Sequence, residues 1–99
     1  MPGSAESTPD ALVVRSDHIL AERVHDETLV LDLSTDRCTR LNRSGSVLWE
    51  ALPCTLADLA RRLEREFALD PARARADAEA FVAELSARGL IRHARNGAS

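Results

Sequence analysis

The sequence predicts an α+β fold in which a three-stranded antiparallel sheet is followed by three helices. Residues 18–42 contain three short runs with strand-like alternation, separated by polar linkers of hairpin length. After residue 42 the apolar residues recur at three- and four-residue spacing, which is typical of amphipathic helices. A chain of 99 residues has room for one such domain.

We expect the folded domain to span residues 15–94. Residues 1–14 begin with Pro, Gly, Ser and Thr without periodicity, which predicts a disordered tail, and residues 95–99 predict a short flexible one. No apolar stretch approaches the length of a membrane span, and the N-terminal segment lacks the basic start and apolar core of a signal peptide. These features favour a cytoplasmic protein without a membrane partner.

The middle strand carries the clearest alternation. Leu29, Leu31 and Leu33 fall on one side of it, and Val30 and Asp32 fall on the other. We therefore expect the three leucines to face the core. The three strands are expected over residues 18–24, 28–34 and 37–42.

Each predicted helix has a start or stop signal. Ser44 is expected to cap the first helix, and Thr55 with Asp58 resembles a capping box at the start of the second. Asp70-Pro71 begins the third helix and Gly89 ends it. The whole expected core is Leu29, Leu31, Leu33, Leu48, Leu52, Leu59, Leu63, Ala78, Val82, Leu85 and Leu90.

Residue sets that carry catalysis are missing from the sequence. Catalysis needs a nucleophile with a base, paired carboxylates, a metal cluster or a phosphate-binding loop, and none of these patterns is present. Cys38 and Cys54 lie apart without a CxxC motif, so we expect two free thiols. We expect no catalytic residue, no metal and no cofactor. A thiol enzyme using Cys38 remains an alternative, although a packed or half-exposed thiol is favoured because no base or second cysteine is adjacent.

A helix-turn-helix over residues 44–67 beside a small sheet is a winged-helix-like arrangement, which many DNA-binding regulators share. The net charge of −3 and the mixed signs of residues 61–66 argue against this function, because affinity for phosphates depends on the number of basic contacts. We expect no nucleic-acid partner. A winged-helix DNA-binding regulator stays an alternative.

The third strand, RCTRL at residues 37–41, is expected at an edge of the sheet. An exposed edge offers unpaired backbone groups, to which an extended peptide can add as a further strand. The basic side chains of Arg37, Arg40 and Arg43 also blunt such an edge against aggregation. The residues alone leave both interpretations open, together with a monomer or a weak homodimer through the same edge.

A longer stretch resembles the PqqD-like family. Its signature is similar to Leu31-Asp32 at the end of one strand, Leu41-Asn42 at the end of the next, and the small residues 44–46 that open a helix carrying Trp49. The resemblance continues through residues 56–70 and ends in RGLI, and it covers about residues 18–92. These positions are largely core positions, so they specify fold and family better than pathway.

The resemblance implies a winged-helix domain that recognises precursor peptides. Such a domain binds the leader segment of a ribosomally synthesised precursor as an added strand beside the third strand, with the third helix as the facing wall. Partners in this family are the precursor leader and a modifying enzyme, such as a leader peptidase. The implied peptide-binding residues are Arg37, Cys38, Thr39, Arg40, Leu41, Asp77, Phe81 and Glu84.

Two pathways are compatible with the resemblance. Standalone members serve a leader peptidase and cyclase in lasso-peptide biosynthesis, or a radical SAM enzyme in quinone-cofactor biosynthesis. The turn Ser34-Thr35-Asp36 stands where the quinone-pathway members usually carry Pro-Glu. This departure favours a lasso-peptide adaptor, with the PqqD-type chaperone as the alternative.

Overall fold

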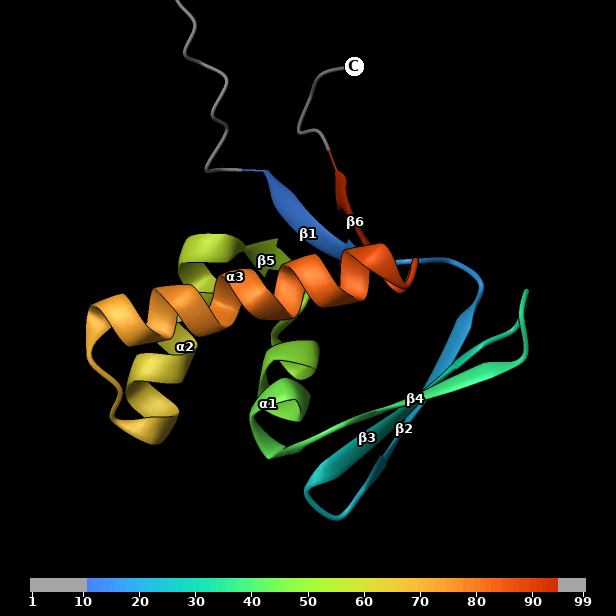
Figure 1. The fold of residues 1–99 in the computed structure, drawn as a ribbon, viewed down its shortest axis with the longest axis horizontal. Coiled ribbons are helices and arrows are strands. Elements are labelled where there is room, and N and C mark those ends of the chain that lie inside the picture. The colour runs from blue at the N-terminus through green and yellow to red at the C-terminus, as the bar shows by residue number, and fades with distance from the viewer. Residues whose placement is uncertain (1–10, 95–99) are drawn as a thin grey trace, which may run out of the picture.

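The computed structural model describes residues 11–94 of the chain. It has two small antiparallel sheets and three helices, shown in Figure 1. The predicted α+β class is confirmed. The tails expected at residues 1–10 and 95–99 lie outside the described residues. No helix of the described part is long and apolar enough to cross a membrane.

The larger sheet is the predicted meander. It has the strand order β2-β3-β4, which leaves β4 at one edge as the sequence predicted. Thr39 pairs with Val30 at its centre, and the sheet extends away from the helices at the lower right of Figure 1. Its strands are β2 Ile19–Val24, β3 Glu27–Asp32 and β4 Arg37–Leu41.

The smaller sheet was not predicted. It has the order β5-β1-β6, and its strands are β1 Leu12–Arg15, β5 Cys54–Thr55 and β6 Ile91–Ala94. The tail expected up to residue 14 is therefore wrong for Leu12, Val13 and Val14, and Val13 is fully buried. Periodicity could not identify strands of two to four residues whose pairing partners lie far away in the sequence.

The three helices are α1 Arg43–Ala51, α2 Leu56–Phe67 and α3 Pro71–Ala87. Thr55 and Asp58 form the predicted capping box, and Asp70 caps α3 with Pro71 at its start. The cap of α1 is Asn42 instead of Ser44, because its side chain accepts the Gly45 N–H at 2.9 Å. Strand β4 therefore passes into α1 through one residue.

The core face of β3 is the reverse of the prediction. Val30 is fully buried and Asp32 is 6% exposed, whereas Leu33 is 51% exposed and Leu29 and Leu31 are only half-buried. Alternation shows that the two faces differ, but not which one lies inward when both carry apolar residues. Val82 is also only half-buried. The other expected core residues are buried: Leu48, Leu52, Leu59, Leu63, Ala78, Leu85 and Leu90.

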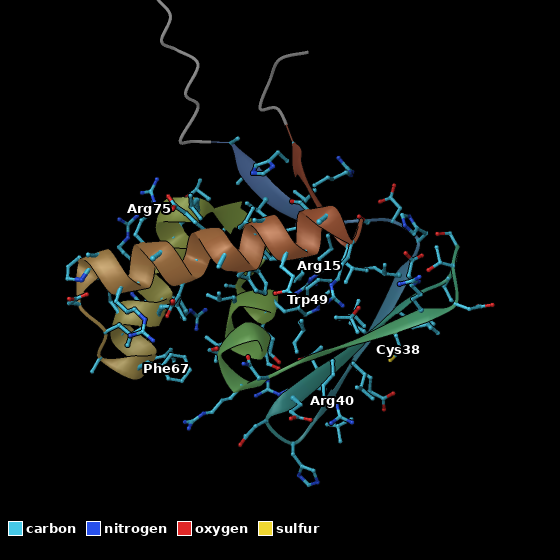
Figure 2. All side chains as sticks on the ribbon, in the orientation of Figure 1. Arg15, Cys38, Arg40, Trp49, Phe67 and Arg75 are labelled. Atoms are coloured by element: carbon cyan, nitrogen blue, oxygen red, sulfur yellow. The ribbon has the colours of Figure 1, made fainter. Side chains whose placement is uncertain are left out.

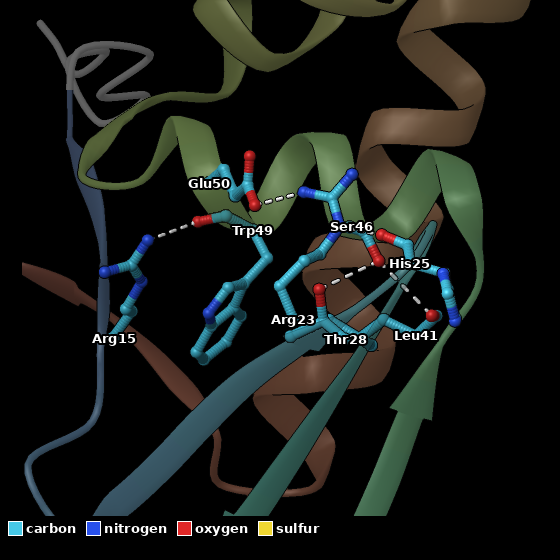
Figure 3. Close-up of polar contacts among 8 residues, drawn as sticks. All are labelled: Arg15, Arg23, His25, Thr28, Leu41, Ser46, Trp49 and Glu50. Atoms are coloured by element: carbon cyan, nitrogen blue, oxygen red, sulfur yellow. Dashed lines mark hydrogen bonds and ion pairs between the residues drawn. The ribbon is translucent and has the colours of Figure 1, made fainter.

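Buried hydrogen bonds explain why polar residues of β3 can face inward. The Thr28 hydroxyl donates to Ser46 Oγ at 2.9 Å, and Ser46 donates to the Leu41 carbonyl oxygen at 3.3 Å (Figure 3). A buried hydroxyl costs little free energy when it is paired in this way. These contacts fix β3, the end of β4 and the start of α1 relative to one another.

Two arginines tie the sheets to α1. Arg15 of β1 donates to the Trp49 carbonyl oxygen at 2.7 Å, and its guanidinium lies 5.1 Å from the centre of the indole ring. Arg23 of β2 forms an ion pair with Glu50, as Figure 3 shows. Helix α1 therefore connects the smaller sheet to the larger one.

Candidate functional site

A groove runs between the edge strand β4 and helix α3. Its volume is about 510 Å³, and it passes over the start of α1. The strand contributes residues 38–41. The helix contributes Asp77, Ala80, Phe81, Glu84, Leu85 and Arg88.

A second hollow, of about 600 Å³, continues the groove toward the start of β4. It is lined by Arg37 and Asp32, and it shares Cys38, Thr39 and Arg88 with the first. The structure therefore brings all eight residues that the sequence singled out for peptide binding to one continuous trough, the β4–α3 groove: Arg37, Cys38, Thr39, Arg40, Leu41, Asp77, Phe81 and Glu84.

The hydrogen-bonding direction of the β4 edge follows from two backbone contacts. The Leu33 N–H donates to the His18 carbonyl oxygen at 2.9 Å, so Leu33 points its backbone groups toward the β2 side of the sheet. The Asp32 carbonyl oxygen accepts the Asp36 N–H at 2.8 Å, on the opposite side. Because backbone groups alternate in an antiparallel ladder, Thr28, Val30 and Asp32 direct theirs toward β4.

The partners of these three residues on β4 are Leu41, Thr39 and Arg37. Their N–H and C=O groups are therefore used within the sheet. Cys38 and Arg40 alternate with them, so their N–H and C=O groups face the open edge. The sequence left undetermined which residues of β4 direct their N–H and C=O groups to the open edge, because a one-residue shift of the strand register reverses the assignment.

Side-chain direction along β4 follows the same alternation. Arg37, Thr39 and Leu41 lie on the face that packs on the helices, since they are opposite the buried residues of β3. Cys38 and Arg40 lie on the other face and are exposed; Figure 2 shows both on the side of β4 away from α3. We infer that these two residues border the groove through the open edge of the strand.

The groove floor is apolar. Phe81 is 9% exposed, and it belongs to the core while lining the groove. Ala80 leaves space beside it. Gly45 allows α1 to approach the strand closely, since a Cβ there would lie 3.2 Å from the Asn42 side-chain oxygen and 3.4 Å from Leu41 Cβ. The sequence indicated no role for Ala80, and it singled out Gly45 only as one of the small residues 44–46 that open the helix, not as a residue beside the groove.

The acids on the groove wall are already paired on their own helix. Asp77 accepts from Arg73 at 3.2 Å, and Glu84 accepts from Arg88 at 3.1 Å. Arg88 also donates to Thr39 Oγ1 at 3.4 Å, and so spans the groove from α3 to β4. Exposed pairs of this kind contribute little stability and can exchange partners. The four-residue spacing from Glu84 was the available signal for Arg88, which the sequence prediction missed.

The described residues offer little reactive chemistry. No group of three or more His, Cys, Asp or Glu side chains among residues 11–94 could hold a metal ion. Cys38 is exposed, which contradicts a packed thiol, and both cysteines are free thiols as expected. Burial raises the pKa of the Cys54 thiol, and Asp58 adds to the rise.

The arginines of α2 do not form a uniform basic surface. Arg61 pairs with Asp58 at 3.1 Å and Arg62 pairs with Glu66 at 3.6 Å. Hydrogen bonds from the Thr55 backbone N–H and from Arg61 lower the pKa of Asp58, which keeps this carboxylate ionised. The carboxylates beside Arg61 and Arg62 oppose phosphate binding, so these two residues provide no support for a DNA-reading role.

Comparison with known proteins places these features in a family. The model of the family described as Coenzyme PQQ synthesis protein D (PqqD) matches residues 27–91. That segment includes β3, β4 and all three helices. No curated protein sequence matches the chain.

Two solved structures share the fold. The structure "TbiB1 in Complex with the TbiA(beta) Leader Peptide" is similar with a TM-score of 0.77 and 21% identity, covering 84% of this chain and 99% of that one. The structure "Lasso peptide synthetase B1 complexed with the leader peptide" has a TM-score of 0.73 and 21% identity, covering 81% and 96%.

Proposed function

Because this chain belongs to the PqqD family, we propose that it is a non-catalytic adaptor that binds the leader segment of a ribosomally synthesised precursor peptide and presents it to modifying enzymes. One observation carries the proposal. An open strand edge at β4 borders a groove whose opposite wall is α3. This geometry fits an extended peptide better than a compact small molecule.

The proposed binding mode is strand addition at β4. The leader lies beside the strand and forms backbone hydrogen bonds with Cys38 and Arg40, whose N–H and C=O groups face the edge. Leader side chains that alternate with these contacts point into the groove toward Phe81. The proposed contact set is Arg37, Cys38, Thr39, Arg40, Leu41, Asp77, Phe81 and Glu84.

Lasso-peptide biosynthesis is the pathway that we favour. Both structurally similar proteins hold a leader peptide, and one is a lasso peptide synthetase. The partner enzyme is then a leader peptidase, acting with a cyclase in the cytoplasm where precursors are translated. A chaperone for a radical SAM enzyme in quinone-cofactor biosynthesis is the second candidate, supported by the description of the matching family.

A binding titration tests the proposal. The probe is a fluorescein-labelled synthetic leader taken from the short precursor gene nearest to the gene for this chain. We expect a Kd near or below about 1 μM, or about −8 kcal/mol, for the leader without its core peptide. The controls are the core peptide alone and a scrambled leader. Binding that requires the core and ignores the leader would contradict the adaptor model.

Salt separates the adaptor from a DNA-binding regulator. Backbone hydrogen bonds depend weakly on ionic strength, whereas each phosphate contact releases counterions and makes binding fall steeply with salt. We expect the Kd for the leader to change little between about 50 and about 200 mM salt, a range over which several phosphate contacts cost about a thousandfold. Tight, salt-sensitive binding of duplex DNA would support the regulator instead.

A further inference from the structure

The face of the larger sheet that points away from the helices is apolar and uncovered by any described element. Leu20, Leu31 and Cys38 lie in one row across β2, β3 and β4, on the face opposite to the buried Val30. Leu29 and Leu33 lie on the same face. The three large hydrophobic residues that are most exposed in the described chain are all here: Leu20 at 59%, Leu33 at 51% and Val24 at 43%.

The exposure of apolar side chains on this outer face is not explained by the fold of a single chain. Exposed apolar residues are common when scattered, but a contiguous patch usually marks an interaction surface. The face lies on the opposite side of the sheet from the β4–α3 groove, so the proposed leader site does not cover it. The face belongs to a sheet that extends beyond the helices (Figure 1).

The charges beside the patch are arranged to suit a second copy of the same chain. Glu22, Leu29 and Arg40 form the next row across β2, β3 and β4. A two-fold axis parallel to β3, midway between two stacked sheets, places β2 of each copy opposite β4 of the other. Glu22 of one copy then faces Arg40 of its partner, twice, while Leu29 and Leu31 meet their own equivalents. Arg40 also lies 3.5 Å from Glu27 of its own chain, so each Arg40 is shared between two carboxylates in the dimer.

We propose that two copies of this chain associate face to face through the outer side of the β2-β3-β4 sheet. Stacked sheets pack about 10 Å apart with nearly aligned strands, which suits leucine side chains from both copies. Three strands of five or six residues give a footprint of about 14 by 20 Å. This footprint is small for an obligate dimer, so the association is weak and depends on concentration.

The arrangement leaves both β4 edges free, and this separates it from dimerisation through β4 itself. In an edge-to-edge dimer Leu20 would lie two strands away from the contact. In the face-to-face dimer Leu20 packs opposite Cys38 of the partner. The proposal does not depend on leader binding, and its test uses the chain alone.

Sedimentation equilibrium over about 5 μM to about 1 mM protein, which brackets the Kd values of weak association, tests the proposal. We expect the average mass to rise with concentration from 10.8 kDa toward twice that value. Leu20→Glu should keep the sample at the monomer mass at every concentration while leaving the circular dichroism spectrum unchanged, because the side chain is exposed. A monomer mass throughout for the unaltered chain would overturn the proposal and assign the face to a different protein.

A charge exchange makes the test specific for the two-fold arrangement. Glu22→Arg and Arg40→Glu should each weaken association at least tenfold, and the double variant should restore it to within a few-fold of the original. Glu79→Arg on α3 is the matched control and should leave association unchanged. Concentration-dependent association that Leu20→Glu and both single charge changes leave intact would place the dimer contact elsewhere and overturn the proposal.

Discussion

Thr28 and Ser46 share a buried hydrogen bond of 2.9 Å that joins the central strand of the larger sheet to α1. Ser46 in turn donates a hydrogen bond to the Leu41 carbonyl oxygen at the end of β4. We predict that Ser46→Ala lowers the free energy of unfolding by about 1–3 kcal/mol, since it leaves the Thr28 hydroxyl buried without a partner. Urea denaturation measures this loss.

The matched variant is Thr28→Val, which keeps the shape of the side chain. It should cost less, about 1 kcal/mol, because Ser46 retains its bond to Leu41. The double variant should cost less than the two single variants together, with a coupling of at least about 0.5 kcal/mol. Strict additivity would show that the two hydroxyls do not interact.

Proline substitutions in β4 test which of its backbone N–H groups face β3 and which face the open edge. Thr39→Pro removes an N–H that bonds β3 and should lower the free energy of unfolding by about 1–3 kcal/mol. Arg40→Pro removes an N–H that faces the open edge, so it should preserve the fold and abolish most leader binding. Thermal unfolding and leader titration on both variants measure these effects.

Cys38→Pro is the control for this pair, because the backbone N–H of Cys38 faces the open edge, like that of Arg40. It should behave like Arg40→Pro in both measurements. If Thr39→Pro and Arg40→Pro both stay folded and bind the leader normally, strand addition at residues 37–41 is wrong.

Ala80 tests the groove without disturbing the core. Phe81 is a poor probe because it is buried, and its truncation to alanine is expected to cost about 3–5 kcal/mol of stability. Ala80 is exposed and lines the groove, so Ala80→Leu should fill space that the leader needs and raise its Kd at least tenfold, about 1.4 kcal/mol. Ala83→Leu, at an exposed position that does not line the groove, should leave the Kd unchanged. Equal effects at both positions would place the leader elsewhere.

The ionised carboxylate of Asp32 makes the stability of the fold depend on pH. Hydrogen bonds from the side chain and backbone of Ser34 lower the pKa of this carboxyl below its ordinary value of 3.8. A carboxyl with a depressed pKa in the folded state stabilises the fold above its unfolded pKa, and that contribution disappears as the pH falls through the folded value. Asp32→Asn should therefore lower the free energy of unfolding near neutral pH. The difference in free energy of unfolding between this variant and the unaltered protein should become smaller below about pH 3.8.

Urea denaturation at about pH 7 and about pH 3 measures this narrowing. Ser34→Ala removes the largest cause of the low pKa of Asp32. The difference in free energy of unfolding between this variant and the unaltered protein should also become smaller between pH 7 and pH 3, a drop of about four pH units. A difference that stays constant with pH in both variants would show that the ionised Asp32 does not stabilise the fold.

Periodicity and capping signals predicted most of the fold. The meander, the capping box at Thr55 and the start of α3 at Asp70 are local features, so the local sequence was sufficient. The smaller sheet was missed because β1 pairs with β6, which lies near the other end of the chain. The β3 face was reversed because Thr28 and Asp32 become favourable inside only through partners that the fold supplies.

The candidate site was predicted as a set of residues but not as a geometry. Resemblance to a family indicated the strand and the facing helix, and the structure places all eight residues along one groove. The parity of β4 depended on backbone contacts around Asp32 and Leu33, which no side-chain pattern records. Ala80 gave no signal, and Arg88 gave only its four-residue spacing from Glu84, because the positions of both residues matter only once α3 lies across β4.

The stacking of Arg15 on Trp49 has an optical consequence. The chain holds one Trp and no Tyr, so its ultraviolet fluorescence comes from a single indole. That indole is 3% exposed and lies under the guanidinium of β1, at the junction between the two sheets. Detachment of the terminal strands would admit water to the ring and shift its emission to longer wavelength. The unlabelled protein therefore reports the docking of its smaller sheet separately from events at the β4 edge.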